Sequence, residues 1–318
     1  MTEHLDVRIK AISWEAPDIH SYELRALSGA DLPPFTAGAH IDLNLPNGMV
    51  RSYSLVNPQT ERHRYVVAAQ KDRATRGGSR CLHERVGVGD TIRISAPRNN
   101  FPVAEEAGHS VLIAGGIGIT PILCMVRRLA TLGRSWELHY CARTRESAAF
   151  LEPLAALQSA QGKLHLNFDG EPGGRMLDLT AVVGAAGEDA HLYCCGPLPM
   201  LAAFEAATAG VAPARVHVEY FTAKEAPVTA GGFTVALKKT GRELFVPEGK
   251  TILEAILDAG IDAPYSCMEG VCGTCETRVL EGVPEHRDLV LTREEQAAGR
   301  TMMICCSGSK SERLVLDL

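Results

Sequence analysis

The sequence predicts a multidomain protein: an antiparallel β-barrel, an α/β domain on a doubly wound parallel sheet, and a small α+β domain. The first hundred residues contain short strand patterns broken by Pro, Gly and Asn, whereas strand and helix patterns alternate after residue 108. A stretch rich in small residues, 222–232, then reads as a linker. We expect domains at 1–104, 105–225 and 226–318.

Six segments of the first part have the alternating or β-branched pattern of strands. They are 7–14, 20–27, 40–45, 50–56, 64–70 and 91–96. Turn-forming residues separate them, and no long helical pattern interrupts the series. Such a series is typical of a small antiparallel barrel.

The middle part begins with a continuous apolar run, 110–116, which is typical of a buried parallel strand. Helical patterns at 121–133, 149–160 and 198–210 alternate with strand patterns at 136–143, 163–169 and 191–197. This alternation predicts βαβ units. In the last part, 233–237 and 243–247 predict a hairpin, and 251–260 predicts a helix capped by Thr251 and ended by Gly260.

Composition limits the classes of function. The 318 residues are 46% hydrophobic and 22% charged, as in a globular protein, and no apolar run is long enough for a transmembrane helix. The N-terminal residues have no apolar signal segment, so we expect a cytoplasmic protein whose ten cysteines are thiols. The net charge of −6 argues against nucleic-acid binding.

The cysteines of the last part predict a redox centre. Cys267, Cys272 and Cys275 have the C-x4-C-x2-C spacing of a plant-type [2Fe–2S] cluster, and one of the pair 305–306 would be the fourth ligand. The segment 301–308 reads as a strand, on which adjacent side chains point to opposite faces, so only one of these two sulfurs can face the cluster. Gly270 and Gly273 allow the backbone to wrap closely around a cluster. The alternative, a structural zinc site, usually has two closely spaced ligand pairs. The spacing therefore favours a ferredoxin-type cluster, which transfers one electron at a time.

Two patterns in the barrel suit a flavin. One strand segment provides a cation for a phosphate, hydroxyl groups for hydrogen bonds and an aromatic face for the ring; its residues are Arg51, Ser52, Tyr53 and Ser54. The later run Arg76-Gly77-Gly78-Ser79 offers consecutive amides and a hydroxyl, as in an anion-binding nest. Each pattern alone also occurs in ordinary strands and loops.

Two loops of the α/β part suit a dinucleotide. The run 115–121, which contains Gly116 and Thr120, joins a buried strand to a helix, so its amides would face a pyrophosphate. It departs from the G-x-G-x-x-G pattern. The segment Cys195-Gly196-Pro197 ends another strand at the same sheet edge, where open α/β sheets bind ligands.

The strand 136–143 ends where the adenosine ribose is expected to bind. Arg143 and Arg145 could hold the 2′-phosphate of NADPH. Glu146 could instead accept hydrogen bonds from the free 2′-hydroxyl of NADH and would repel the phosphate. These residues alone leave the choice of nucleotide open.

In this order, the RSYSL, GGS, GGIGITP, CCGP-x-x-M and cysteine motifs resemble the phthalate dioxygenase reductase family. That family includes the reductase components of vanillate demethylase and phenoxybenzoate dioxygenase. The resemblance covers the whole chain and implies FMN, NADH and a [2Fe–2S] cluster as cofactors. It also implies that Cys305, first in the M-I-C-x-S pattern, is the fourth cluster ligand.

The resemblance further implies roles for single residues. Arg51, Tyr53 and Ser54 would surround the flavin, Gly78 and Ser79 would bind its phosphate, and Phe221 would cover its ring. The nicotinamide nucleotide would be lined by Gly116, Thr120, Cys195, Gly196 and Pro197. The sequence departs from one relative's pattern at Gln70, where a basic residue can occur, and Lys71 follows it.

The implied function is electron transfer from NADH through FMN and the cluster to an external acceptor, the Rieske cluster of an oxygenase that demethylates or dihydroxylates aromatic compounds. A nicotinamide gives up two electrons as a hydride, a cluster accepts one, and a flavin can do both. We expect a monomer that binds neither nucleic acid nor membrane and assign no side chain as catalytic acid or base. The alternative is a stand-alone flavin and iron–sulfur NAD(P)H reductase serving another acceptor.

Overall fold

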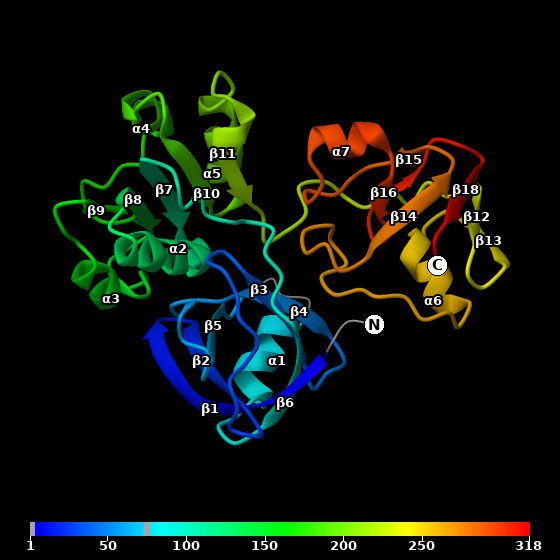
Figure 1. Cartoon of the computed structure of the whole chain (residues 1–318), viewed down its shortest axis with the longest axis horizontal. Helices are drawn as coiled ribbons and strands as arrows, with labels where there is room; N and C mark the ends of the chain where they lie inside the picture. The colour runs from blue at the N-terminus through cyan, green and yellow to red at the C-terminus, as the bar shows by residue number, and fades with distance from the viewer. Residues whose placement is uncertain (1–3, 73–76) are drawn as a thin grey trace. The chain divides into compact units, whose positions relative to one another are not determined.

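The computed structural model describes residues 4–72 and 77–318 (Figure 1). The chain forms two compact units, Met1–Glu219 and Tyr220–Leu318. The expected boundary at 104/105 falls inside the first unit, and the one at 225/226 falls shortly after the start of the second. Among the described residues, no helix has both the length and the apolar character needed to cross a bilayer.

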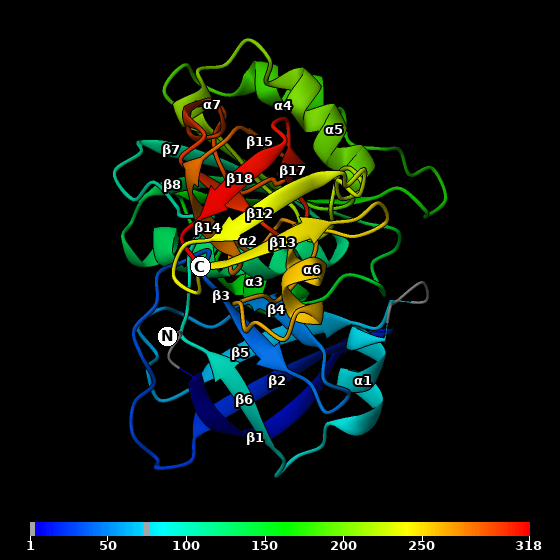
Figure 2. The same cartoon turned by 90° about the vertical axis from the view of Figure 1, so that its right-hand side faces the viewer.

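The first part of the chain forms one antiparallel sheet from all six predicted strands, with the order β4-β3-β6-β1-β2-β5 (Figure 2). The strands are β1 (His4–Ala16), β2 (Ile19–Ala26), β3 (His40–Asn44), β4 (Val50–Ser54), β5 (Tyr65–Gln70) and β6 (Thr91–Ser95). The amide of Val56 donates to the carbonyl of Val66 at 2.8 Å, which joins the two edges into a barrel. The sequence patterns missed the short helix α1 (Gly78–Arg85).

The middle part forms a parallel sheet with the order β11-β10-β7-β8-β9. Its strands are β7 (His109–Gly115), β8 (Ser135–Ala142), β9 (Gly162–Phe168), β10 (His191–Cys195) and β11 (Val216–Glu219). Its helices are α2 (Ile119–Thr131), α3 (Leu151–Ala156), α4 (Leu179–Ala185) and α5 (Leu198–Ala207). The central position of β7 explains its apolar sequence, because a strand buried on both faces meets no water. Sequence patterns did not predict α4 and β11.

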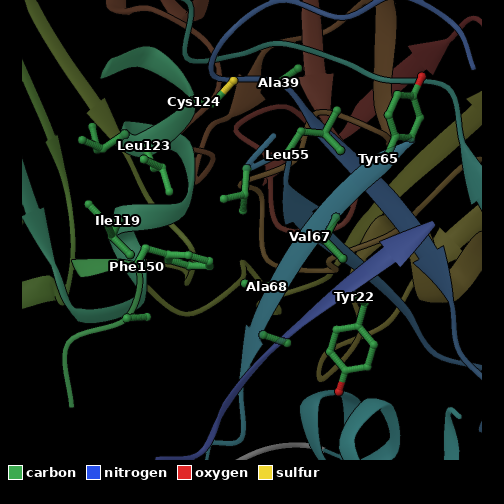
Figure 3. Packing of buried hydrophobic residues seen from close by; sticks show 14 of the residues in the cluster. Tyr22, Ala39, Leu55, Tyr65, Val67, Ala68, Ile119, Leu123, Cys124 and Phe150 are labelled. Atoms are coloured by element: carbon green, nitrogen blue, oxygen red, sulfur yellow. The ribbon is translucent and has the colours of Figure 1, made fainter. Parts of the chain in front are cut away.

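The barrel and the parallel sheet share one hydrophobic core (Figure 3). Leu55 and Val67 of the barrel and Leu123 of α2 belong to the same buried cluster. Two hydrogen bonds fasten α2 to the barrel: Cys124 Sγ donates to the carbonyl of Asn57 at 3.2 Å, and Arg127 donates to that of Val56 at 2.7 Å. The flavin and nucleotide motifs therefore lie on one compact unit.

The second unit has a sheet with the order β13-β12-β18-β14-β16 and a small ladder of β15 and β17. Its elements are β12 (Phe233–Leu237), β13 (Arg242–Val246), α6 (Ile252–Asp258), β14 (Glu276–Glu281), β15 (Pro284–Glu285), α7 (Arg293–Ala298), β16 (Thr301–Met303), β17 (Gly308–Ser309) and β18 (Arg313–Leu316). The predicted hairpin and helix α6 are confirmed, and Thr251 caps α6 in a capping box with Glu254.

One local prediction for this unit is wrong. The segment 301–308 was expected to be a single strand, but β16 ends at Met303 and residues 304–306 form a turn. The amides of Cys306 and Ser307 both donate to the carbonyl of Met303, at 3.2 and 3.0 Å. Met302, Met303 and Ile304 are buried, and the turn lies against Gly270 of the cysteine loop.

Candidate functional site

The face of β4 that carries Ser52 serves the barrel framework. The hydroxyl of Ser52 donates to Asp42 Oδ1 at 2.7 Å, and Arg98 binds the other oxygen of Asp42 at 2.7 Å. Asp42 is buried, so this charge needs both partners. Ser54 lies on the same face of the strand and is also buried, because alternate residues of a strand share a face. Ser52 is thus set apart from Arg51 and Tyr53.

Arg51 and Tyr53 share the opposite face of β4 and lie beside α1. A Cβ atom added to Gly78 would lie 2.9 Å from Cγ and Nε of Arg51. Burial raises the pKa of Tyr53 to about 12, with Arg51 opposing the shift and Cys81 of α1 adding to it. The structure therefore brings the cation, the aromatic ring and the start of α1 together.

The start of α1 fits a phosphate. Its N-cap residue is Gly77, with φ of 110°, and a glycine has no side chain to accept hydrogen bonds from the first-turn amides. Those amides and the helix dipole favour an anion. The hydroxyl of Ser79 accepts from the amide of Asp72 at 3.2 Å, which positions it at this end of the helix. Arg76, from the same motif, lies outside the described residues.

Lys71, the basic residue after Gln70, forms an ion pair with a carboxylate of α1. Lys71 Nζ lies 2.8 Å from Glu84 Oε1 of α1, and this contact lowers the pKa of Glu84. Gln70 ends β5 and is exposed. Lys71 therefore joins β5 to α1 through an ion pair at the surface.

The two loops predicted for a dinucleotide contact each other at the carboxyl ends of β7 and β10. A Cβ atom at Gly118 would lie 2.2 Å from the carbonyl oxygen of Cys195, and one at Gly196 would lie 3.2 Å from Cα of Gly115. Gly116 has φ of 54° and open space beside it. Gly118 and Gly196 let the two loops pack backbone against backbone, and Gly116 leaves open space at the sheet edge, which suits a pyrophosphate.

Thr120 and Pro197 shape these loops. Thr120 is buried, and its hydroxyl donates to the carbonyl of Ile117 at 3.0 Å. Pro197 is the N-cap residue of α5, and its Cδ would lie 2.7 Å from a Cβ at Gly115. Both residues fix the loop backbone.

The ends of β8 and β9 form a charged pair, of which only the arginine was predicted from the sequence. Arg143 Nη1 donates to Asp169 Oδ2 at 3.1 Å, and the guanidinium of Arg145 lies over the ring of Phe168 at 5.2 Å. The amide of Arg145 donates to Glu171 at 2.7 Å. The signal that was missed is the acidic residue directly after a parallel strand, which commonly contacts a ribose.

A second missed residue is Glu219 at the end of β11. It is the register partner of Cys195, whose Sγ lies 3.9 Å from its Oε2. Burial raises the pKa of Glu219 to about 8 and that of Cys195 well above its ordinary value. Both groups hold a proton near neutral pH. Phe221 lies in the second unit, so its contact with a flavin stays a prediction.

Four buried sulfurs converge in the second unit. Hydrogen-bond contacts connect Cys272 with Cys267, Cys267 with Cys305, and Cys305 with Cys275. The contacts from Cys267 and Cys275 hold the pKa of Cys305 below its usual range. A thiolate is the form that binds iron, so this donor set fits a [2Fe–2S] cluster.

The backbone of the cysteine loop has the expected left-handed residues. Gly270 and Gly273 have φ of 70° and 77°, and Met268, which the sequence analysis did not single out, has φ of 60°. A Cβ at Gly270 would lie 2.4 Å from Cys306 Sγ. The loop therefore closes tightly over the turn that carries Cys305 and Cys306.

Cys306 has partners outside the four-sulfur group. Its Sγ lies 3.7 Å from the carbonyl of Met303 and 3.8 Å from the hydroxyl of Ser307. Contact with Cys305 and burial raise its pKa, which favours the neutral thiol. The choice of Cys305 as ligand stays a prediction, now based on these contacts.

Comparisons with known proteins identify the domains. The family of 2Fe-2S iron-sulfur cluster binding domains matches residues 235–309, and the family of oxidoreductase NAD-binding domains matches residues 112–206. The chain is 55% identical over 314 residues to phenoxybenzoate dioxygenase subunit beta of Ectopseudomonas oleovorans, covering 99% of this chain and 97% of that protein. It is 53% identical over 317 residues to tetrachlorobenzoquinone reductase of Sphingobium chlorophenolicum, covering 99% and 98%.

A solved structure matches over the same length. It is phthalate dioxygenase reductase, described as a modular structure for electron transfer from pyridine nucleotides to [2Fe–2S], with 38% identity and a TM-score of 0.74. The match covers 99% of this chain and 98% of that one. The chain belongs to the phthalate dioxygenase reductase family.

Family membership confirms the main sequence expectations. The chain is an oxidoreductase of the oxygenase-reductase type, with a barrel, an NAD-binding domain and a [2Fe–2S] domain in that order. The domain matches and the family also confirm the expected cofactors, which are FMN, NADH and a [2Fe–2S] cluster. Several of its relatives, such as phenoxybenzoate dioxygenase subunit beta, are subunits of oxygenase systems, which supports an oxygenase as partner.

Proposed function

We propose that this reductase takes electrons from NADH at its first unit and delivers them singly, from its second unit, to a Rieske-type oxygenase. The observation that carries the proposal is the contact of Arg51 with Gly78, because it joins the two flavin motifs into one site. FMN supplies hydride acceptance and single-electron release when bound, and the cluster carries one electron at a time. We further propose a monomer with domains at 1–104, 105–225 and 226–318.

The residues proposed for the flavin site act through charge and shape. Arg51 and the first amides of α1 would neutralise the phosphate, and the half-buried Tyr53 would supply an apolar face. Ser79 would donate a hydrogen bond, whereas Ser52 and Ser54, on the other face of β4, would hold the strand in place behind Arg51 and Tyr53. The full proposed set is Arg51, Ser52, Tyr53, Ser54, Gly77, Gly78, Ser79 and Phe221.

The residues proposed for the nucleotide site leave backbone accessible at the sheet edge and add little charge there. The glycine loops would let the pyrophosphate approach the backbone, and Thr120 and Pro197 hold the loops in place. Cys195 and Glu219 keep their protons near neutral pH, so the edge carries little charge beside a nicotinamide. The proposed set is Gly116, Thr120, Arg143, Cys195, Gly196 and Pro197.

NADH is the nucleotide that the strand ends favour. Asp169 offsets the charge of Arg143 at 3.1 Å, and Glu171 adds a second carboxylate nearby. A 2′-phosphate would meet this acidic pair, whereas a free 2′-hydroxyl can donate to it.

Removal of the second unit tests the electron path. A fragment ending at Glu225 contains the whole shared core of barrel and sheet and keeps Phe221, so it should fold and bind FMN. We expect it to reduce ferricyanide with NADH as fast as the full chain, but to lose reduction of cytochrome c and of a Rieske oxygenase. Equal cytochrome c reduction by both proteins would contradict an exit through the cluster.

A second candidate function is direct reduction of a quinone, favoured by the 53% identity to a protein named tetrachlorobenzoquinone reductase. Quinones accept electron pairs from a reduced flavin and do not need the cluster. Full activity toward a quinone in a Cys305→Ser variant, alongside lost activity toward an oxygenase, would separate the two functions.

A further inference from the structure

Three metal-ligating side chains meet on one face of the parallel sheet, away from the strand ends that carry the nucleotide motifs. Glu137 and His139 are two residues apart on β8, so both point to the same face. His165 of β9 is the register partner of His139. Strand geometry therefore brings one carboxylate and two imidazoles to one place.

The three side chains already lie within ligand range of one another. Nε2 of His139 is 2.9 Å from Oε1 of Glu137, and Nε2 of His165 is 3.1 Å from the same oxygen. One ligand atom of each residue lies within 4.8 Å of the others. The ligand atoms of a tetrahedral zinc site are about 3.4 Å apart, given its bond lengths. A small expansion of the cluster would thus fit an ion.

Ion binding requires one of the imidazoles to turn. The rings of His139 and His165 stack with centroids 4.7 Å apart and planes inclined by 13°, whereas a bound metal lies in the plane of each ring. The side chain of His165 is 48% exposed and free to turn, while that of His139 is 12% exposed and held by the sheet.

A pocket of about 280 Å³ borders two of the three side chains, Glu137 and His139, and gives an ion access to them. Ala181, Val182 and Ala185 of α4 form an apolar wall of this pocket. The apolar wall strengthens the attraction between a carboxylate and a cation. The space also admits water as a further ligand.

We infer that Glu137, His139 and His165 form a binding site for a divalent transition cation of the Zn²⁺ class. Imidazole and carboxylate ligands suit Zn²⁺, Ni²⁺ and Cu²⁺, whereas Mg²⁺ and Ca²⁺ select oxygen ligands. Three protein ligands leave one position open. The ion would link β8 to β9. These are the two strands that end directly before Arg143 and Asp169.

Zn²⁺ binding to the holoprotein tests the site. Equilibrium dialysis with Zn²⁺ alone, on protein with full flavin, iron and sulfide content, should give one bound Zn²⁺ per wild-type chain. His165→Ala and Glu137→Gln should each bind at least tenfold more weakly. His63→Ala removes an exposed histidine of the barrel and should bind like the wild type. Equal binding by all proteins, or no bound Zn²⁺ in the wild type, would overturn the site.

Electron paramagnetic resonance of added Cu²⁺ gives an independent readout. The oxidised cluster and oxidised flavin have no net spin, so the signal reports copper alone. The wild type should give hyperfine splitting from two imidazole nitrogens, and His165→Ala from one. An identical spectrum in both proteins would show that copper binds elsewhere and would refute the assignment.

Discussion

Gly78 and Arg51 touch only because Gly78 has no side chain: an added Cβ would lie 2.9 Å from Cγ of Arg51. Gly78→Ala should therefore push Arg51 away from the start of α1. A charge-assisted hydrogen bond contributes about 1.5–3 kcal/mol, so we expect FMN to bind at least tenfold more weakly. The measurement is flavin release followed by fluorescence.

The matched control is Gly108→Ala, since a Cβ at Gly108 has open space. This variant should keep the wild-type affinity for FMN. Unchanged affinity in Gly78→Ala would mean that Arg51 does not contact the phosphate.

Cys305→Ser should abolish the cluster, whereas Cys306→Ser should keep it. Cys305 contacts Cys267 and Cys275 as well as Cys306, while Cys306 contacts Cys305 and has further partners in the turn. Iron and sulfide analysis and the visible spectrum distinguish the variants. Loss of iron from Cys306→Ser alone would reverse the assignment.

Asp169→Asn should weaken the preference for NADH. The substitution removes the carboxylate paired with Arg143 and so leaves that guanidinium available for a 2′-phosphate. We expect the ratio of kcat/KM for NADH over NADPH to exceed ten in the wild type and to fall about tenfold in the variant. A wild-type ratio below one would refute the NADH assignment.

The first unit should lose stability in acid through His217. Burial lowers the pKa of His217 from 6.5 to about 4, and His191, 3.0 Å away, adds to the shift. The unfolded chain then takes up a proton that the folded chain refuses, so stability is full above pH 6.5 and falls as the pH approaches 4.

Urea unfolding at pH 7 and pH 5 measures this effect. His217 is partly exposed, so we expect a loss of about 1 kcal/mol between the two pH values. The loss should be smaller in His217→Gln, and His63→Gln should keep the wild-type difference. The same pH dependence in all three proteins would place the titrating group elsewhere.

Hydrophobic patterns within single segments of the sequence predicted most of the strands and helices. The six barrel strands follow from alternation, and the apolar run of β7 follows from its central position in the sheet. The short strand β11 and helix α4 were missed because neither has enough residues for a clear period. The turn after Met303 was missed because its residues are buried and therefore apolar, and a short apolar run in the sequence resembles a buried strand.

The candidate site was predictable in its residue types but not in its contacts. The cysteine spacing and glycine loops follow from chemistry that requires those residues at those positions. The pairing of Cys195 with Glu219, and of Arg143 with Asp169, depends on which strands lie side by side in the sheet. Strand order is a property of the whole domain, so no single segment reveals it.

The core shared by the barrel and α2 decides where this protein can be recombined with its relatives. A chimera joined near residue 104 would combine two half-cores from different ancestors, and Leu123 and Cys124 would meet a surface that did not evolve with them. A chimera joined after Glu219 exchanges a module with its own separate core. Reductases with new protein acceptors are therefore best built by grafting at the second position.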